Sequence, residues 1–370
     1  MLKMTVKATI GSRTFSAIPP APPAHPKRVA GLDLGFVQTK FVWGTRRPQY
    51  SDAGIMVDPG NTCKFGSLVK RRSEVATEGL EDAEGYVIVD EHGTWNVGSK
   101  GSYDFTSERL TRDSDLPKLY TALALFRQQT GSSIIDLLVS GLPVDEYSQY
   151  RGALQQALTG DFQFGFGSQQ MQISVKKVAV IPQAAGAFYD YGLTDDGKLT
   201  DSPLLRETVL VFDIGGKTTD GCIMEKSKYS QDSFTIRQGI WKVHNELRKL
   251  IARHYRGFVL APSEVDAVMR TGILNIGGTQ EDVTHLRTKA LETHFPAIRD
   301  ELSVYVDDLR RFSAILVAGG GAALYTPYIQ SITSVPVIQL SHAEYSNASG
   351  YRKYGMLLMG GVTHGPELRR

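Results

Sequence analysis

Eight consecutive residues in the middle of the chain have the types that bind phosphate. Residues 213–220 read Asp-Ile-Gly-Gly-Lys-Thr-Thr-Asp. Because glycine adopts positive φ without steric cost, adjacent glycines can direct several backbone N–H groups into one concavity that holds phosphate oxygens. Threonine hydroxyls add donors, and a carboxylate at a strand end can hold Mg²⁺ through water. The alternative is an ordinary glycine-rich turn. The candidate ligands here are Asp213, Gly215, Gly216, Lys217, Thr218 and Thr219.

A second segment near the N-terminus follows the same plan. Residues 33–40 read Asp-Leu-Gly-Phe-Val-Gln-Thr-Lys. Lys40 could contact a β- or γ-phosphate as a point charge, or it could be a solvated lysine on an edge strand. Asp33 follows an apolar strand, where an unpaired carboxylate is costly. The segment therefore contributes Asp33, Gly35, Thr39 and Lys40 as candidate ligands.

A third glycine cluster stands between an expected strand and an expected helix. Gly319, Gly320 and Gly321 form it. Such a junction brings the backbone close to a flat or anionic ligand at a helix N-terminus. The spacing does not match G-x-G-x-x-G, and the chain has no GxxxxGK[ST], so neither a dinucleotide-binding Rossmann unit nor a P-loop is supported.

The elements around these segments alternate between strands and amphipathic helices, which predicts an α/β protein. Segments 29–43 and 209–224 share the order strand, Asp-x-Gly turn, strand, and they stand about 180 residues apart. This similarity predicts a duplicated domain with a cleft between the copies. The expected strands are 28–34, 40–43, 86–89, 134–140, 173–180, 208–213, 221–224 and 313–317. The expected helices are 115–130, 145–159, 184–191, 241–255, 262–271, 282–305 and 320–332.

Composition limits the class of protein. The chain has 370 residues, which suggests about two domains, and its 41% hydrophobic and 22% charged residues are typical of a globular protein. The formal net charge is only +2, whereas direct nucleic-acid binding needs a concentrated basic surface. Cys63 and Cys222 provide neither a disulfide framework nor a four-thiolate zinc site. No apolar stretch approaches the ~20 residues of a membrane span. We therefore expect a cytoplasmic protein without membrane contact.

The three glycine segments, in this order, resemble the two phosphate hairpins and the adenosine loop of the actin-like ATPase superfamily. Residues 139–144, Val-Ser-Gly-Leu-Pro-Val, followed by a helix, resemble ParM/StbA-type plasmid-segregation actins. Residues 178–187 resemble the first connecting segment of these proteins. The resemblance covers about residues 27–359. It implies an actin-like, ribonuclease H-like duplicated fold of two domains with a nucleotide cleft between them.

Domain limits follow from this resemblance and from local composition. Residues 1–27 contain the proline-rich stretch 17–26 and are expected to form a flexible extension, either a plain tail or a docking peptide. Domain I is expected at 28–185 plus 340–370, with an insertion at about 52–105. Domain II is expected at 186–339, with a smaller subdomain at about 240–300.

The resemblance also implies roles for single residues. Asp33 and Asp213 would hold Mg²⁺ through water, and Gln183 would orient the attacking water without acting as a strong base. Phe36 and Val37 replace the hydroxyl or glycine that such first hairpins often carry, which leaves Thr39 as the substitute donor. Candidates for the ribose contact are Lys242 and Glu246. The sequence favours a capping role for Asn347.

The function implied by the resemblance is a filament-forming ATPase that segregates or positions DNA, as in plasmid partition. Its cofactors would be ATP or GTP and Mg²⁺. Its partners would be further copies of itself and a DNA-bound adaptor protein, without direct DNA binding. The alternatives are a small-molecule kinase or a non-polymerising ATPase of the same superfamily. The chain shows no acceptor motif of the kind that a kinase would need.

Overall fold

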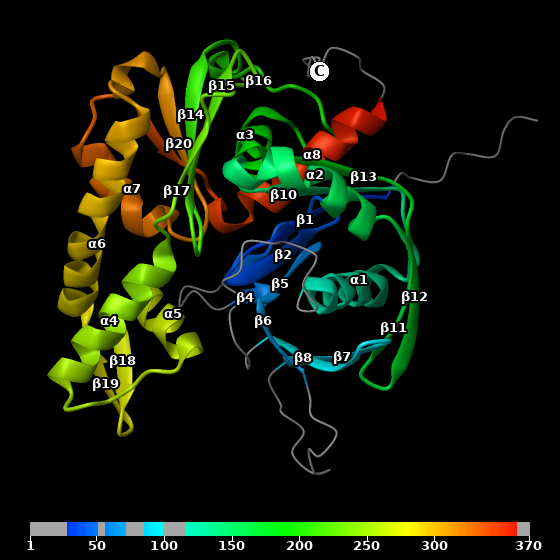
Figure 1. The fold of residues 1–370 in the computed structure, drawn as a ribbon, viewed down its shortest axis with the longest axis horizontal. Coiled ribbons are helices and arrows are strands. Elements are labelled where there is room, and N and C mark those ends of the chain that lie inside the picture. The colour runs from blue at the N-terminus through cyan, green and yellow to red at the C-terminus, as the bar shows by residue number, and fades with distance from the viewer. Residues whose placement is uncertain (1–27, 51–55, 72–84, 99–114, 361–370) are drawn as a thin grey trace, which may run out of the picture.

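The computed structural model of the chain describes residues 28–50, 56–71, 85–98 and 115–360. The predicted extension 1–27 and parts of the predicted insertion 52–105 lie outside these residues. Figure 1 shows the described chain as two α/β halves side by side, each built on its own sheet. We call the half that holds the N-terminal sheet the first half and the other the second half.

The sheet of the first half has the order β13-β10-β1-β2-β5. Strands β1 (Val29–Leu34) and β2 (Gln38–Val42) form an antiparallel hairpin, and β5 (Thr62–Gly66) pairs with β2. Strands β10 (Leu137–Leu142) and β13 (Val178–Pro182) run parallel to β1. All six residues of β1 are buried, which explains why it reads as a continuous apolar run around one aspartate.

The sheet of the second half repeats this plan. Its order is β16-β15-β14-β20-β21, with β17 also paired to β15. Strands β14 and β15 form an antiparallel hairpin, and β20 and β21 run parallel to β14. The bounds are β14 (Thr208–Ile214), β15 (Thr219–Glu225), β16 (Lys228–Tyr229), β17 (Phe234–Ile236), β20 (Ala314–Ala318) and β21 (Val337–Gln339). The predicted duplicated fold is confirmed by this repeated order.

A third, six-stranded sheet lies beside the first half. Its order is β6-β8-β7-β11-β12-β9. The bounds are β6 (Leu68–Arg71), β7 (Gly85–Asp90), β8 (Gly93–Gly98), β9 (Ile134–Ile135), β11 (Gly160–Phe166) and β12 (Gln169–Val175). The sequence pattern predicts no strand at β11, and two of the predicted strands each span two observed ones. One of them joins β9 to β10 and the other joins β12 to β13, although each pair belongs to two different sheets.

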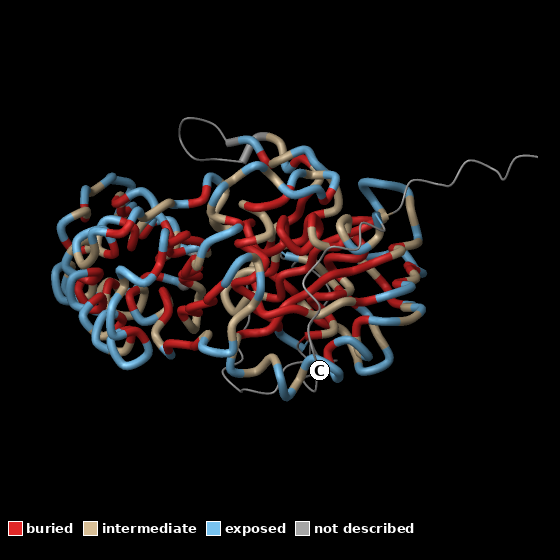
Figure 2. Tube along the Cα trace, turned by 90° about the horizontal axis from the view of Figure 1, so that it is seen from above, coloured by how far each residue is buried: buried red, intermediate tan, exposed pale blue. Residues whose placement is uncertain are grey.

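Two helices connect the halves. Helices α3 (Gln183–Gly192) and α8 (Ser346–Gly360) pack against each other, and α3 contacts strands of the main sheet of each half. One hydrophobic cluster joins Val139 of β10, Phe188 of α3 and Val211 of β14. Figure 2 shows buried residues (red) gathered in the interior and exposed residues (pale blue) around the outside.

Each of the other long helices lies within one half, and the first of them packs between the first-half sheet and the third sheet. Helices α1 (Asp115–Thr130) and α2 (Val144–Leu158) belong to the first half. The second half holds α4 (Ile240–His254), α5 (Pro262–Thr271), α6 (Thr284–Tyr305) and α7 (Ala322–Ser331). Two small hairpins complete the strands: β3 (Gln49–Tyr50) with β4 (Met56–Asp58), and β18 (Ile273–Ile276) with β19 (Thr279–Asp282).

Helix bounds agree with the predicted ones within a few residues. Helix α6 begins at Thr284 rather than at Asp282, because Asp282 ends β19 and its carboxylate accepts the backbone N–H of Thr284 at 2.8 Å. Among the described residues, none of the helices combines the length and apolarity needed to span a bilayer.

Candidate functional site

A cavity that is partly open to solvent lies between the two halves. Its walls include the turn between β1 and β2 (the first hairpin turn, residues 35–37) and the turn between β14 and β15 (the second hairpin turn, residues 215–218). An ideal Cβ on Gly216 would lie 2.4 Å from Cγ2 of Val37, so the two turns touch and only glycine fits there.

Asp33 and Asp213 occupy equivalent places at the carboxyl ends of β1 and β14. Both are buried and both line the cavity. Lys40 lies opposite Asp33 in the hairpin register, with its Nζ 3.6 Å from Oδ2 of Asp33. The amide Nδ2 of Asn347 donates to Oδ2 of Asp213 at 2.8 Å.

Burial raises the pKa of Asp213 to about 6. The hydrogen bond from Asn347 opposes this rise, the charge of Asp33 adds to it, and Lys40 opposes it. The influence of Asp33 indicates that the two carboxylates are close enough to repel each other. A divalent cation held between them would relieve that repulsion.

The two carboxylates fit a water-mediated Mg²⁺ site. The described residues contain no group of three or more His, Cys, Asp or Glu side chains that could enclose a metal. Mg²⁺ commonly keeps several waters and binds through one or two carboxylates together with substrate phosphates. The donor set of Asp33 and Asp213 is of this kind.

Most of the predicted site residues line the cavity. They are Asp33, Gly35, Lys40, Gln183, Asp213, Gly215, Gly216, Lys217, Thr218, Gly319 and Gly320. Gln183 is the first residue of α3 and is 9% exposed. Gly319 has φ of +85°, and a Cβ there would lie 2.4 Å from Oδ1 of Asp213, so this position also requires glycine.

Three predicted ligands do not reach the cavity. The hydroxyl of Thr39 lies 3.1 Å from that of Ser67 inside the first half, and Thr219 donates to the carbonyl of Gln238 at 2.7 Å. Both threonines lie within strands and point away from the face used by their neighbours Lys40 and Thr218. Gly321 packs against Ile214 instead, to whose carbonyl its N–H donates at 3.0 Å. The predicted hydroxyl contact from Thr39 is therefore wrong.

The predicted ribose contacts are also not at the cavity. Lys242 donates to Oε1 of Gln238 at 2.7 Å, and Glu246 lies 3.7 Å from Lys249. The residues of this region that line the cavity are Ile240 and His244 of α4, Asp266, Met269 and Arg270 of α5, and Leu324 of α7. Burial lowers the pKa of His244, while Asp266 raises it and Arg270 lowers it further.

Sequence reasoning missed several polar residues of the site. Asn347, expected as a helix cap, bonds Asp213 instead. Two ion pairs also contribute lining residues: Lys118 with Asp115 at 2.7 Å, and Lys64 with Glu344 at 2.9 Å. The signal for Asn347 was an amide side chain in the first turn of a helix. Nothing local identified the ion pairs.

Two family profiles match the chain, and together they include the three glycine segments. The profile "Actin like proteins N terminal domain" matches residues 31–186, and "Archaeal actin homologue MreB-like, C-terminal" matches residues 211–331. Among curated proteins there is no significant sequence match.

Solved structures resemble the chain over nearly its whole length. An archaeal actin homologue in complex with ADP has a TM-score of 0.70 at 19% identity, covering 89% of this chain and 99% of that one. A 15-stranded ParM filament from Clostridium botulinum has a TM-score of 0.66 at 20% identity, covering 90% and 99%. A non-polymerisable quadruple mutant of the pCBH ParM has a TM-score of 0.67 at 22% identity, covering 89% and 99%. At these identities the likeness establishes the fold.

Proposed function

The chain belongs to the actin-like superfamily, and from this premise we propose that it is an ATPase that assembles into nucleotide-dependent filaments to segregate or position DNA. The observation that carries the proposal is the pair of glycine-bearing hairpin turns that meet across the cavity, each preceded by a buried aspartate. This arrangement can enclose one triphosphate and its Mg²⁺ between two halves of a molecule.

The phosphates would lie between the two hairpin turns. Backbone N–H groups of Gly35 and of Gly216 to Thr218 would line a phosphate nest, whereas the Gly215 N–H already donates to the carbonyl of Thr218 at 2.9 Å. The Lys40 ammonium lies near the first hairpin turn, since a Cβ on Gly35 would be 3.5 Å from its Nζ. Mg²⁺, held through water by Asp33 and Asp213, would neutralise phosphate charge. Gln183 would orient the attacking water.

The nucleoside would lie against the second half. Gly319 and Gly320 bring the backbone to the cavity wall, and α4 and α5 add apolar and polar side chains there. A wall that combines Ile240 and Met269 with His244 and Asp266 can pack against a base and bond a ribose. We propose ATP as the ligand, with GTP as the alternative.

Assembly is supported by the nature of the neighbours. One of them is a ParM filament, and another is a ParM mutant described as non-polymerisable. A head-to-tail contact that repeats from copy to copy without closing into a ring would build such a filament. Hydrolysis would remove the γ-phosphate contacts that hold the two halves together and so weaken the polymer. In the cytoplasm, a DNA-bound adaptor protein would link the filament to its cargo, and a net charge of +2 agrees with indirect DNA contact.

Light scattering after addition of ATP and Mg²⁺ tests this function. We expect a rise that decays as ATP is consumed, and filaments in electron micrographs with a slowly hydrolysed ATP analogue. ADP should give no lasting rise. Hydrolysis without any scattering increase at high protein concentration would instead indicate a non-polymerising ATPase. Phosphorylation of a small acceptor would indicate a kinase.

A further inference from the structure

The outer part of the third sheet has an edge that the described chain leaves mostly unpaired. Strand β12 pairs with β11 along its whole length. On the other side of β12, strand β9 pairs only with Ser174 and Val175. No other described strand pairs with residues 169–173 on that side. Figure 1 shows β12 at the outer margin of the first half.

The backbone groups along this edge are directed outward. The N–H of Ser174 donates to the carbonyl of Ser133 at 2.8 Å, away from β11. Because the direction of hydrogen bonding alternates along an antiparallel strand, the N–H and carbonyl groups of Gln170 and Gln172 point the same way as those of Ser174. Nη1 of Arg127 donates to the carbonyl of Gln172 at 2.5 Å, which agrees with this direction. The N–H groups of Gln170 and Gln172 have no backbone partner among the described residues, so they can pair with an added strand.

An open groove follows the same edge. Its lining combines Met171 and Gln172 of β12 with Arg127 of α1. Met171 and Ile173 are buried on the face of β12 that packs toward α1, whereas Gln170 and Gln172 are exposed on the opposite face. A strand added here would therefore have one apolar side and one solvent-facing side, which requires an alternating sequence.

Residues 2–10 of this chain have such a sequence. They read Leu-Lys-Met-Thr-Val-Lys-Ala-Thr-Ile, in which apolar and polar residues alternate strictly. A period of two is typical of a strand with one apolar face. The segment lies outside the described residues, in the extension for which the sequence leaves two roles open, a plain tail and a docking peptide. The alternation favours the docking peptide.

The extension joins the described chain next to the unpaired edge. The first described residue is Arg28, whose Nη1 donates to Oγ of Ser132 at 2.8 Å. The next residue, Ser133, provides the carbonyl that accepts the N–H of Ser174 in β12. From Ser174 to Gln170 the strand extends only roughly 13 Å, at about 3.3 Å per residue. The attachment point and the unpaired edge are therefore near each other.

A proline-rich stretch separates the alternating segment from this attachment point. Residues 17–26 include five prolines, a composition that favours the stiff polyproline conformation. At about 3.1 Å per residue, this stretch would span about 31 Å. Such a length carries residues 2–10 past the edge of their own copy and toward a neighbouring molecule.

We propose that residues 2–10 of one copy pair, as an additional strand, with the β12 edge of a second copy. The outward backbone groups of Gln170 and Gln172 would gain partners, and the apolar side chains of the added strand would lie beside Met171 and Ile173. The contact lies on the third sheet and needs no nucleotide. It therefore links copies of the chain independently of the ATPase activity proposed above.

Photocrosslinking of the full-length chain tests this contact. Both native cysteines are buried, so a benzophenone maleimide attaches selectively to the variant Thr5→Cys. Equal amounts of isotope-labelled and unlabelled Thr5→Cys protein are mixed, irradiated and digested. We expect crosslinked peptides that join position 5 to residues 169–173. Because either copy can provide the segment, about half of these peptides should combine a labelled with an unlabelled partner.

Proline substitutions test the pairing itself. Proline cannot donate to a ladder, so Val6→Pro in the Thr5→Cys background should lower the crosslinking yield at least about tenfold. Gln170→Pro removes an outward N–H from the edge and should lower the yield in the same way. Ala21→Pro is the matched control, because it adds a proline to a stretch that is already proline-rich. Its yield should stay within about twofold of the parent.

The isotope pattern separates the possible hosts. Crosslinks to residues 169–173 that never combine labelled and unlabelled partners would overturn the second copy as host, since the segment would then dock on its own chain. Crosslinks spread over other surfaces, or a parental yield with Val6→Pro, would overturn the strand pairing.

The mixture is irradiated with and without ATP to separate this contact from the proposed function. Mixed crosslinks at residues 169–173 in a protein that neither hydrolyses ATP nor assembles with it would support the contact while the proposed function fails. A protein that hydrolyses ATP and assembles, but gives no such crosslinks, would overturn the contact alone.

Discussion

Asp213 is a buried carboxylate whose environment opposes its charge. It is 2% exposed, and its pKa is raised to about 6, mainly by burial. In the nucleotide-free protein at neutral pH, this side chain therefore lowers the free energy of unfolding. Such a cost is typical of residues that are held ready for a ligand, since a bound cation would stabilise the charge.

Asp213→Asn should make the nucleotide-free protein more stable. The folded pKa lies above the value of 3.8 for a free carboxyl, so the parent takes up a proton on folding between about pH 4 and pH 6 and loses stability as pH rises through that window. Above pH 6 the variant should gain about 1–3 kcal/mol. The gain should vanish near pH 4. Urea unfolding at pH 4.5 and 7.5 with EDTA measures it, and equal stabilities of the two proteins at pH 7.5 would contradict the expectation.

The same variant separates stability from function. The amide of asparagine lacks the negative charge and the second oxygen that a carboxylate offers to hydrated Mg²⁺, so ATP hydrolysis by Asp213→Asn should fall at least about 100-fold. If Asp213→Asn is more stable than the parent and no longer hydrolyses ATP, the same side chain both destabilises the nucleotide-free protein and is needed for hydrolysis. Unchanged hydrolysis would remove Asp213 from the site.

Gln183 should affect turnover more than binding. It lies at the start of α3 and lines the cavity, but no role in phosphate binding is assigned to it. Gln183→Ala should slow ATP hydrolysis by about 10–100-fold, because the attacking water loses its orientation. Nucleotide binding and filament assembly should stay near parental levels, measured by analogue fluorescence and light scattering. Parental hydrolysis by this variant would show that the water is oriented by another group.

At the scale of elements, the junction between β20 and α7 depends on one glycine. Gly319 has φ of +85°, and an added Cβ would lie 2.4 Å both from Oδ1 of Asp213 and from the carbonyl oxygen of Ile214. Gly319→Ala should lower the free energy of unfolding by about 2 kcal/mol or more, because it combines backbone strain with a steric clash. Thermal unfolding of the nucleotide-free protein measures the loss.

Gly320 provides the matched control for this junction. It is the next residue, it also lines the cavity, and a Cβ there meets no atom within 4 Å. Gly320→Ala should change the stability of the nucleotide-free protein by less than about 0.5 kcal/mol. Equal losses for the two variants would mean that the junction is generally sensitive and that the conformation of Gly319 is not the cause.

The elements that could be predicted from the sequence are those with local signals. The two hairpins, their glycines and both aspartates depend on residues adjacent in the chain, and the structure brings them to one cavity. Strand β11 was missed although Phe162, Phe164 and Phe166 alternate with less apolar residues, which is a period of two. The alternation was hidden because the segment directly follows a helix.

The contacts that could not be predicted join distant parts of the chain. Asn347 and Asp213 are 134 residues apart, and Lys64 and Glu344 are 280 residues apart. No periodicity encodes such pairs, since they form only when α8 packs between the sheets. Thr39 was assigned to the wrong side of its strand, because a shift of one residue reverses the face of a side chain.

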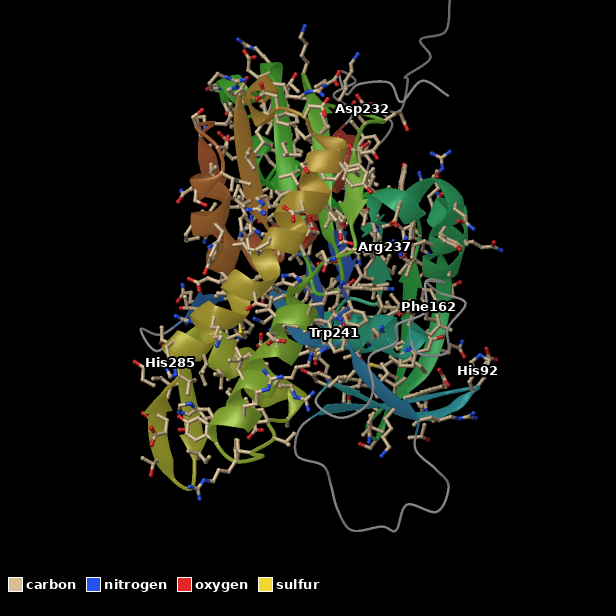
Figure 3. All side chains as sticks on the ribbon, turned by 60° about the vertical axis from the view of Figure 1, so that its left-hand side comes forward. His92, Phe162, Asp232, Arg237, Trp241 and His285 are labelled. Carbon is tan, nitrogen blue, oxygen red and sulfur yellow. The ribbon has the colours of Figure 1, made fainter. Side chains whose placement is uncertain are left out.

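At the scale of the whole molecule, an ion pair joins the first half to the second half. Nη2 of Arg237 donates to Oδ2 of Asp145 at 2.6 Å, and the backbone N–H of Asp145 donates to Oγ1 of Thr235 at 3.4 Å. Asp145 belongs to α2 of the first half, whereas Arg237 lies between β17 and α4 of the second. Figure 3, in which Arg237 is labelled, shows this side chain at the boundary between the halves.

The segment that carries Arg237 is attached to the second hairpin turn. The backbone N–H of Ile240 donates to the carbonyl of Gly215 at 3.0 Å, and that of Trp241 donates to Gly216 at 2.9 Å. Movement of this turn would therefore move the segment with it. The ion pair thus connects the second hairpin turn of one half to helix α2 of the other half.

Breaking this ion pair should speed release of the bound nucleotide. Arg237 is largely exposed, so the pair contributes at most about 1 kcal/mol, which corresponds to an increase in the dissociation rate of up to about fivefold. Arg237→Ala and Asp145→Asn should each produce this increase, and the double variant should produce no more than either alone. High salt should reduce the difference from the parent.

Stopped-flow release of a fluorescent nucleotide measures these dissociation rates. The control is Arg310→Ala, which breaks the exposed ion pair to Asp308. Additive effects of the two substitutions would show that the pair does not act as one contact holding the halves closed.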